Sequence, residues 1–235
     1  MAEDLIELGK KNAAIKAVKD NVKKGMIIGI GSGSTVVYAV QEIFKINKIK
    51  NLGLKCIPTS YQSRQLILDN KLGLATLDQY PNVDLDIDGA DEVDSTLNLI
   101  KGGGGCHVQE KIVASVSKKV VIVVDFRKKS EFLGENWKKG IPVEVIPLGY
   151  VPIMNKLKEI GGHPVLRMAK SKMGPVVSDN GNFIIDVDFG TLKNPSELNN
   201  LIKKIPGVVE TGLFLGITSS VYIGQKDGSV KILKN

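Results

Sequence analysis

The stretch that decides the fold is Val-Asp-Leu-Asp-Ile-Asp-Gly-Ala-Asp-Glu, residues 83–92. Apolar and acidic residues alternate up to Asp88, which predicts a β-strand with one apolar face, and Gly89 ends it. In an open α/β sheet, ligands bind in the crevice beyond the carboxyl ends of the strands. We therefore expect Asp88 and Asp91 to lie at the mouth of a binding crevice.

Strands and helices alternate on both sides of this stretch. The spacing of apolar residues predicts helix 4–22, strand 25–30, helix 36–44, strand 52–57, helix 59–68, strand 72–77, strand 83–88, helix 108–116 and strand 120–124. This alternation is typical of a doubly wound, mostly parallel sheet. We expect residues 1–134 to form this Rossmann-like α/β domain, together with a returning hairpin in residues 219–235.

The pattern changes beyond about residue 135. It predicts strand 143–146, helix 151–160, strand 165–168, strand 183–187 after an Asn180-Gly181 turn, helix 195–205 and strand 208–215. The order β-α-β-β-α-β is that of the ferredoxin-like split unit. We therefore expect a second, smaller ferredoxin-like α+β domain in residues 135–218.

Composition excludes several classes of protein. No apolar run is long enough to span a bilayer, and the first residues lack the basic and apolar regions of a signal peptide. Cys56 and Cys106 form no disulfide framework, which fits a reducing, cytoplasmic location. The net charge is +7, but the lysines are scattered and no aromatic residues interleave with them, so we expect no nucleic-acid partner and no membrane partner. A basic surface attracts small phosphorylated metabolites equally well.

A glycine loop, Gly-Ile-Gly-Ser-Gly-Ser, occupies residues 29–34 between the first strand and the next helix. Ser34 replaces the third glycine of a dinucleotide fingerprint, and Ile-Pro-Thr at 57–59 stands where a ribose-binding acid belongs. No lysine follows Gly33, which excludes a P-loop. Loop amides and hydroxyls at a helix N-terminus instead suit a small phosphate monoester, and the alternative is a plain tight turn.

Metal binding is not expected. The alternating aspartates match the start of a calcium-binding loop, but Ser95 stands where its bidentate glutamate belongs. Asp84 and Asp86 are therefore interpreted as solvated or capping residues on the polar face of the strand. His107 and His163 are the only histidines, so no histidine cluster for zinc exists, and both are expected to be structural.

Lys101 precedes four consecutive glycines, residues 102–105. Glycines cost backbone entropy, so a loop that keeps four of them indicates close approach to another group or unusual torsions. The alternative is a flexible surface loop. With a helix beginning near Val108, its free amides and Lys101 form a second anion-stabilising site. Glu110 lies in the first helical turn, where the helix dipole favours an acid in any case.

These groups together suit proton abstraction next to the carbonyl of a phosphorylated sugar. A carboxylate base removes a proton and returns it to the adjacent carbon, while a lysine and backbone amides stabilise the enediolate oxygen. Triosephosphate isomerase uses a glutamate base in this role.

Motifs spread along the chain also resemble those of a known family. They are Gly-Ile-Gly-Ser-Gly-Ser-Thr at 29–35, Asp-Gly-Ala-Asp-Glu at 88–92, Lys-Gly-Gly-Gly-Gly at 101–105 followed by Glu110-Lys111, Pro-Val-Glu-Val-Ile-Pro at 142–147, and Ile-Pro-Gly-Val-Val at 205–209 with Gly-Leu-Phe at 212–214. In this order they resemble ribose-5-phosphate isomerase of the A type. The resemblance implies an aldose-ketose isomerase of the non-oxidative pentose phosphate pathway, which interconverts D-ribose 5-phosphate and D-ribulose 5-phosphate. It also implies no cofactor, no metal, and a homodimer or dimer of dimers.

The resemblance assigns roles to individual residues. Glu110 is the general base that moves the proton between C1 and C2, and Lys101 stabilises the enediolate. Asp88 assists ring opening or hydroxyl proton transfer, and Asp91 binds sugar hydroxyls. The other substrate-binding residues that it implies are Ser32, Gly33, Ser34, Thr35, Gly89, Ala90, Gly102, Gly103 and Gly104.

Two further lysines complete the implied site. Lys128 matches the family lysine after the strand that ends at Asp125, and Lys11 matches an N-terminal phosphate-contacting lysine. Arg127 stands where the family usually has a serine, so Arg127 or Lys129 can replace Lys128 in contacting the substrate. Which of the two glycine loops holds the phosphate stays open.

Two other classes of function remain as alternatives. A non-catalytic sugar-phosphate-sensing module should carry a helix-turn-helix segment or a partner domain, and no such pattern is visible. A nucleotide-dependent oxidoreductase is opposed by Ser34 and by the missing ribose-binding acid.

Overall fold

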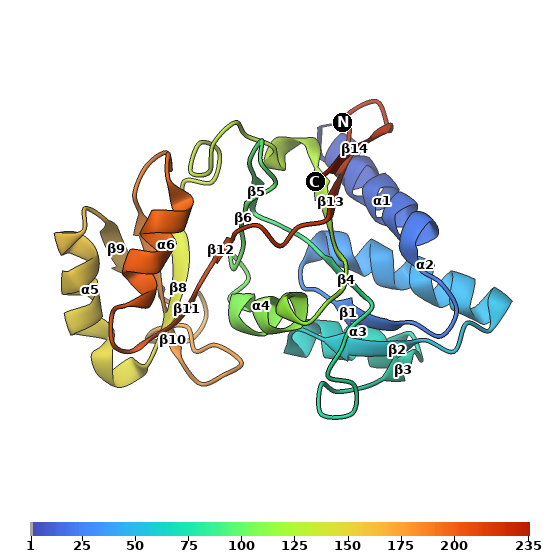
Figure 1. Cartoon of the computed structure of the whole chain (residues 1–235), viewed down its shortest axis with the longest axis horizontal. Coiled ribbons are helices and arrows are strands. Elements are labelled where there is room, and N and C mark those ends of the chain that lie inside the picture. The colour runs from blue at the N-terminus through green and yellow to red at the C-terminus, as the bar shows by residue number, and fades with distance from the viewer. Residues whose placement is uncertain (1) are drawn as a thin grey trace. The chain divides into compact units, whose positions relative to one another are not determined.

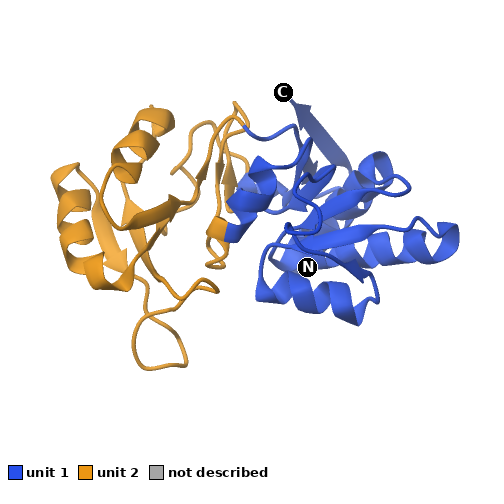
Figure 2. Ribbon diagram, turned by 60° about the horizontal axis from the view of Figure 1, so that its bottom comes forward, with its two compact units in different colours: residues 1–90, 109–128, 217–235 blue, residues 91–108, 129–216 orange. Residues whose placement is uncertain are grey.

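The computed structural model describes residues 2–235, which form two compact units (Figure 2). Of the described residues, 2–90, 109–128 and 217–235 form unit 1, and 91–108 and 129–216 form unit 2. The sequence-based boundaries placed residues 91–108 and 129–134 in the first domain, whereas they belong to unit 2 here. Within the described residues, no helix is both long and apolar enough to cross a membrane.

Unit 1 is built on a seven-stranded sheet with the strand order β14-β13-β7-β4-β1-β2-β3 (Figure 1). Its strands are β1 (Ile27–Ile30), β2 (Lys55–Pro58), β3 (Gly73–Leu74), β4 (Leu85–Asp88), β7 (Val120–Asp125), β13 (Ser220–Gly224) and β14 (Val230–Lys234). Neighbouring strands are parallel except for the antiparallel hairpin β13-β14. The predicted doubly wound, mostly parallel sheet is therefore confirmed, including the return of the C-terminal hairpin.

Helices cover both faces of this sheet. They are α1 (Ala2–Asn21), α2 (Ser34–Lys50), α3 (Tyr61–Asp69) and α4 (His107–Ser115), and a single 3₁₀ turn follows β7 at Phe126–Lys128. Small side chains of α1, such as Ala14 and Ala17, pack with α2 and with the side chains of β1 and β4 that point to that face. Val113 of α4 packs in a different cluster, with Ile57 and Val83. The sheet thus has apolar contacts on two sides.

Because helices cover both faces of the sheet, the acidic residues of strand β4 lie in a different environment from the one expected. Asp86 was expected to be a solvated or capping residue, and solvation is wrong because Asp86 is only 1% exposed. A Cβ atom at Gly29 would lie 2.5 Å from Val113 and 2.6 Å from the Asp86 carboxylate, so α4 covers the face that the alternation suggested was open. Asp84 does cap a strand end, since its carboxylate accepts the amide hydrogen bond of Ile27.

Unit 2 contains a four-stranded antiparallel sheet with the order β11-β8-β10-β9. Its elements are β8 (Ile141–Val145), the 3₁₀ turn Pro147–Gly149, α5 (Tyr150–Glu159), β9 (His163–Leu166), β10 (Phe183–Asp188), α6 (Pro195–Lys203) and β11 (Val208–Thr211). This order confirms the predicted β-α-β-β-α-β unit. Ile153 of α5 and Ile202 of α6 pack on the same strand residues, including Val143 and Ile185, so both helices cover one face.

A small third sheet in unit 2 was not predicted. Its strands, in the order β12-β6-β5, are β5 (Glu92–Val93), β6 (Leu99–Ile100) and β12 (Leu213–Phe214). The expected strand 208–215 therefore divides at Gly212 between two sheets. A Cβ atom there would lie 2.2 Å from the Lys101 carbonyl oxygen, so the close approach of the two backbones requires glycine.

Candidate functional site

In unit 1, the carboxylate of Asp88 lies against the glycine loop. Its Oδ1 accepts hydrogen bonds from the amides of Ser32 at 3.0 Å and Gly89 at 2.7 Å, and the side chain is 1% exposed. A Cβ atom at Gly31 would lie 1.9 Å from the same oxygen. Gly31 is therefore needed because the carboxylate occupies the space that a side chain would take.

The glycine loop is also held from the following βα connection. The Ser32 hydroxyl donates to the Ser60 hydroxyl at 2.7 Å and lies 3.1 Å from the Thr59 hydroxyl. The amide of Gly33 donates to the side chain of Gln62. The sequence interpretation missed these three partners. The available signal was the run Thr-Ser at 59–60, which follows β2 at the sheet edge that also carries the loop.

The loop leads into the N-terminus of α2, a helix of 17 residues. Its N-cap residue is Gly33, with a φ of 108°, and glycine has no side chain to bond the first-turn amides. Ser34 and Thr35 begin the helix, and Ser34 is exposed. Amides of a helix N-terminus together with hydroxyl groups form an environment that suits a phosphate dianion.

Glu110 lies in the first turn of α4, as the sequence predicted. Its side chain is 4% exposed. It stands one turn before Val113, the residue that packs over β1 and β4, so the two share the face of α4 that is directed at the sheet. The two predicted acid-base residues of unit 1, Asp88 at the end of β4 and Glu110 in the first turn of α4, are therefore both buried.

The end of β7 carries an ion pair. Arg127 donates to both carboxylate oxygens of Asp125, from Nε at 2.7 Å and from Nη2 at 3.0 Å. Burial raises the pKa of Asp125, but the hydrogen bonds from Arg127 outweigh it and lower the pKa below its usual value. Arg127 is thus engaged with Asp125, while the next residue, Lys128, is half-buried and Lys129 is exposed.

The predicted N-terminal lysine, Lys11, is exposed on α1. The preceding residue, Lys10, is more buried and pairs with Glu7 at 2.7 Å, and the hydroxyl of Tyr38 donates to the second oxygen of Glu7 at 2.6 Å. The hydrogen bond from Lys10, followed by that from Tyr38, lowers the pKa of Glu7. Tyr38 lies one turn after Ser34 in α2, so this network joins α1 to the first turns of α2. The sequence interpretation missed it.

In unit 2, Asp91 and Lys101 are held beside the glycine run. The carboxylate of Asp91 accepts the amide hydrogen bond of Gly103 at 2.7 Å. The backbone amide of Lys101 donates to the carbonyl of Gly212 at 2.8 Å, and its ammonium group lies 5.3 Å from the ring centre of Phe214. The Lys101 side chain is 3% exposed. Unit 2 thus brings together the predicted acid, lysine and glycines, and the run is anchored at several points.

Arg167 also contacts this glycine run, and the sequence interpretation missed it. Its guanidinium group donates to the carbonyl oxygens of Gly102 and Gly103 and forms an ion pair with Asp186. The only local signal was a cation within an otherwise apolar strand-like segment, followed by an acid in the next strand. The pairing of the two cannot be read from their spacing.

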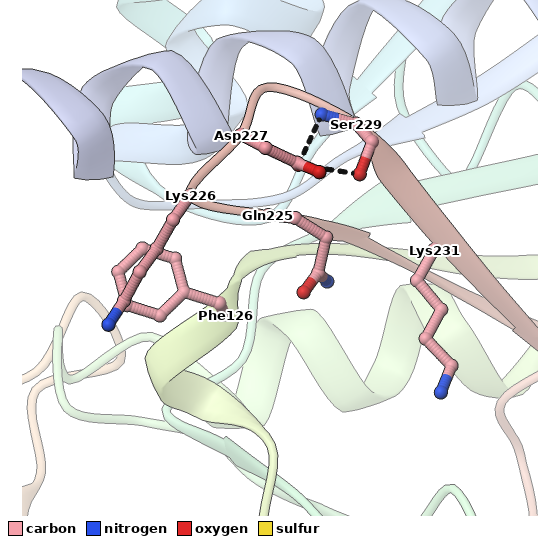
Figure 3. Close-up of a pocket in the computed structure, with 6 residues that line it drawn as sticks. All are labelled: Phe126, Gln225, Lys226, Asp227, Ser229 and Lys231. Carbon is pink, nitrogen blue, oxygen red and sulfur yellow. Dashed lines mark hydrogen bonds between the residues drawn. The ribbon is translucent and has the colours of Figure 1, made fainter.

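Two pockets in unit 1 lie apart from the predicted residues. One, of about 630 Å³, is drawn in Figure 3, where Lys226 lies over the ring of Phe126 and Asp227 accepts hydrogen bonds from Ser229. Those hydrogen bonds lower the pKa of Asp227. The other, of about 330 Å³, is lined mostly by apolar side chains, including Ile112 and Val113 of α4. Across residues 2–235, no group of three or more histidines, cysteines, aspartates or glutamates is placed to hold a metal ion.

Comparisons with known proteins agree along nearly the whole chain. A family model of ribose 5-phosphate isomerase A (phosphoriboisomerase A) matches residues 55–228. The ribose-5-phosphate isomerase of Dictyostelium discoideum is 58% identical over 229 residues, which cover 95% of this chain and 96% of that protein. The human ribose-5-phosphate isomerase is 55% identical over 227 residues, which cover 96% of this chain and 73% of that protein.

Solved structures agree with the sequence comparisons. Ribose 5-phosphate isomerase A from Methanocaldococcus jannaschii superimposes with a TM-score of 0.91 at 45% identity, and the match covers all of both chains. A D-ribose-5-phosphate isomerase in complex with phospho-erythronic acid has a TM-score of 0.94 at 38% identity, covering 98% of this chain and 99% of the other.

Proposed function

The chain belongs to the ribose 5-phosphate isomerase A family, and we propose that it interconverts D-ribose 5-phosphate and D-ribulose 5-phosphate through an enediolate. The observation that carries this proposal is the carboxylate of Asp88, which is buried and hydrogen-bonded to the amide of Ser32 in the glycine loop. That arrangement couples an acid-base group to a loop that suits a phosphate. An isomerase of a phosphorylated sugar needs both.

The ligand of one relative supports the same class of substrate. Phospho-erythronic acid, present in the relative with a TM-score of 0.94, contains a phosphate group and a carboxylate. A carboxylate is planar and spreads negative charge over two oxygens, as an enediolate does. Enzymes bind molecules that resemble the transition state more tightly than substrates. A sugar phosphate is therefore the ligand that the family membership favours for this chain.

In the proposed reaction, Glu110 is the general base. Its carboxylate removes the proton from C2 of the open-chain aldose, a C1–C2 double bond forms, and the carbonyl electrons move to O1. Asp88 passes the hydroxyl proton from O2 to O1, and Glu110 returns its own proton to C1, which yields the ketose. The burial of Glu110 limits exchange of that proton with water during the transfer.

Lys101 and the glycine run stabilise the charge that develops on the sugar oxygens. The ammonium group of Lys101 is nearly excluded from solvent, where its interaction with an oxyanion is stronger than in water. Asp91 and the backbone of residues 102–104 bind the hydroxyl groups, together with Gly89 and Ala90. Asp91 also fixes the amide of Gly103, so the run needs less ordering when substrate binds.

The phosphate group is proposed to bind at the N-terminus of α2. The amides of residues 32–35 and the hydroxyls of Ser32, Ser34 and Thr35 are the donors, and the helix dipole adds to their effect. Lys128 supplies a positive charge from the turn after β7, and either Lys11 or Lys10 supplies one from α1. Lys10 is the stronger candidate because the network of Glu7 and Tyr38 fixes it close to α2.

We also propose that the chain forms a homo-oligomer, either a dimer or a dimer of dimers, and acts in the cytoplasm. Light scattering after size-exclusion chromatography measures the mass in solution. A mass that is two or four times the 25.4 kDa of one chain is expected, and a single chain mass contradicts the oligomer.

The experiment that tests the isomerase activity is incubation of the protein with ribose 5-phosphate, with a chelator present and no added cofactor. Ketose is expected to form in the native protein. The Glu110→Gln variant should still bind the sugar phosphate but lose turnover by at least about 10³-fold, because the amide cannot accept the C2 proton. Binding without turnover in the native protein would instead indicate the non-catalytic sensor, and near-normal turnover of the variant would exclude Glu110 as the base.

A further inference from the structure

The four-stranded sheet of unit 2 has one face that packs on helices and a second face that carries both apolar and polar side chains. Ile185 and Val187 of β10 point to the helices α5 and α6, so the alternating residue Asp186 points to the other face. Ile184 shares that other face, and its side chain would lie 3.1 Å from a Cβ atom at Gly105. Gly105 of the glycine run therefore lies against this second face of the sheet.

Arg167, directly after β9, spans the distance between the sheet and the run. Its Nε and Nη2 atoms donate to the two carboxylate oxygens of Asp186, at 2.8 and 2.5 Å. Its Nη1 atom donates to the carbonyl oxygens of Gly102 at 2.9 Å and Gly103 at 3.3 Å. The side chains are only 16% and 19% exposed, so this is a shielded, bidentate ion pair with a third nitrogen directed at the loop.

Within the loop, the carbonyl of Gly102 accepts a hydrogen bond from the amide of Gly105 at 2.9 Å, and Arg167 adds an external donor to the same oxygen and one to the carbonyl of Gly103. Because a peptide is planar and trans, holding the carbonyl of Gly102 in one direction turns the amide of Gly103 the opposite way, where it donates to Asp91. Holding the carbonyl of Gly103 fixes the amide of Gly104 in the same manner. Glycines adopt many backbone conformations, so four in succession need such external contacts to present one set of amides.

We propose that Arg167, held in place by Asp186, is a positioning residue for the isomerase, which sets the peptide groups of residues 102–104 and the adjoining Lys101 for the enediolate. This role presupposes the activity proposed above. Arg167 itself does not touch the reacting atoms. It acts through the loop, and its removal leaves the phosphate-binding groups of unit 1 unchanged.

The test compares steady-state kinetics of Arg167→Ala with those of the native protein and of Lys203→Ala. Lys203 is a matched control in unit 2, since it pairs with Glu210 and donates to a backbone carbonyl, that of Val209, but does not contact the glycine run. We expect kcat of Arg167→Ala to fall by about 10- to 100-fold with a change in KM below about 3-fold, because a misplaced group mainly weakens the transition state. Lys203→Ala should retain native kcat.

Chemical rescue separates positioning from a general loss of structure. Guanidinium chloride, at a concentration that leaves Lys203→Ala active, should restore kcat of Arg167→Ala by filling the space of the lost group, and should not raise kcat of the native protein. Arg167→Lys and Asp186→Asn, which keep a cation or an acceptor, should lie between native and alanine variants. If Arg167→Ala does not fold, these two variants carry the test.

Native kcat in Arg167→Ala, or in both conservative variants, overturns the positioning role. So does a reduced kcat that guanidinium does not restore. Absence of isomerase activity in the native protein refutes the proposed function itself, and is thereby distinguishable from failure of this inference.

Discussion

The two glycine loops, one in each unit, are built in different ways. The loop at residues 31–35 is held by its neighbours in the βα framework, namely the end of β4 at Asp88 and the start of α3 at Ser60. The run at 102–105 follows β6, a strand of only two residues, and is held by side chains distant in sequence, above all Arg167. The loop at 31–35 is ordered by adjacent secondary structure, whereas the run at 102–105 is ordered by hydrogen bonds to the charged side chains of Asp91 and Arg167.

This difference predicts different responses to substitution. A loop inside a packed βα connection has little room to adjust, because the sheet and the helix on either side are fixed by apolar packing. A run that depends on a few hydrogen bonds should lose its alignment gradually, as the contacts are removed one by one. Variants at glycines in the two loops, and at Gly212 beside the second loop, test the comparison directly.

The largest effect is expected for Gly31→Ala. The new Cβ atom would lie 1.9 Å from Asp88 Oδ1 and 2.6 Å from its Cα, so the carboxylate and the loop cannot keep their positions. Proton transfer by Asp88 and phosphate binding by the loop are both proposed to depend on that contact. We therefore expect kcat/KM to fall by at least about 10²-fold. Steady-state kinetics with ribose 5-phosphate, alongside circular dichroism to monitor folding, measure the effect. Native kcat/KM in a folded variant would show that the contact of Asp88 with the loop is not needed.

The next effect is expected for Gly212→Ala in unit 2. Its Cβ atom would lie 2.2 Å from the carbonyl oxygen of Lys101, which forces the two backbones apart. We expect the free energy of unfolding to fall by about 1–3 kcal/mol, as in other overpacked interiors, and the activity to fall with the displacement of Lys101. Urea unfolding monitored by fluorescence checks the stability.

Gly104→Ala is the control for that measurement. No atom lies within 4 Å of a Cβ at Gly104, and its φ is not in the left-handed region. The free energy of unfolding should therefore rise slightly or stay within about 0.5 kcal/mol of native, since alanine restricts the unfolded chain. A decrease as large as that of Gly212→Ala would mean that glycines in this region are sensitive for a reason other than close backbone contact.

The same contrast explains what the sequence could predict. The strand ending at Asp88, the glycine loop and the helix that follows are contiguous, and periodicity together with turn residues predicts them. The burial of Asp86 was missed because the alternation of residues in its strand indicates only one apolar face. Val113, which covers the other face of the strand, comes from a later helix. The ion pair of Arg167 and Asp186 was missed for a similar reason.

The motifs predicted the family, but they did not predict the contacts that hold Lys101 and the glycine run in place. Lys101 and its glycines were recognisable as a unit because they are consecutive. The short strands that hold them have only two residues each, too few for any periodicity to show, and their pairing joins residues 99–100 to residues 213–214. Contacts between such distant segments depend on the whole fold, so a single sequence does not contain them in readable form.

A smaller effect distinguishes the two N-terminal lysines. Lys10→Ala removes the cation that pairs with Glu7 near α2, whereas Lys11→Ala removes an exposed one. We expect KM for ribose 5-phosphate to rise by about 5- to 10-fold in the first variant and by less than about 2-fold in the second, with kcat little changed, because a phosphate contact contributes mainly uniform binding. A larger rise for Lys11→Ala would assign the phosphate contact to that lysine, as the sequence resemblance implied.

The smallest effect is expected at the opposite end of β4, in Asp84→Asn. The amide of Ile27, followed by Lys118, donates a hydrogen bond to this carboxylate and lowers its pKa. A group with a depressed folded pKa contributes stability that is present above the unfolded pKa, near 3.8, and is lost as pH falls through the folded value. Lys118 is largely exposed and solvent screens the pair, so Asp84→Asn should lower the free energy of unfolding by less than about 1 kcal/mol at neutral pH.

Urea unfolding of the native protein and the Asp84→Asn variant across the acidic range measures this difference. The difference in free energy of unfolding between the native protein and the variant should vanish as the pH falls through the folded pKa of Asp84. The protonated native carboxyl then resembles the amide of asparagine. The kcat of the variant should equal the native value at neutral pH, since Asp84 lies at the amino-terminal end of β4, the end remote from Asp88. If the difference in free energy of unfolding persists at low pH, the stabilisation by Asp84 comes from its hydrogen bond with the amide of Ile27 alone. A loss of kcat would show that the whole strand, and not only its carboxyl end, takes part in placing the catalytic groups.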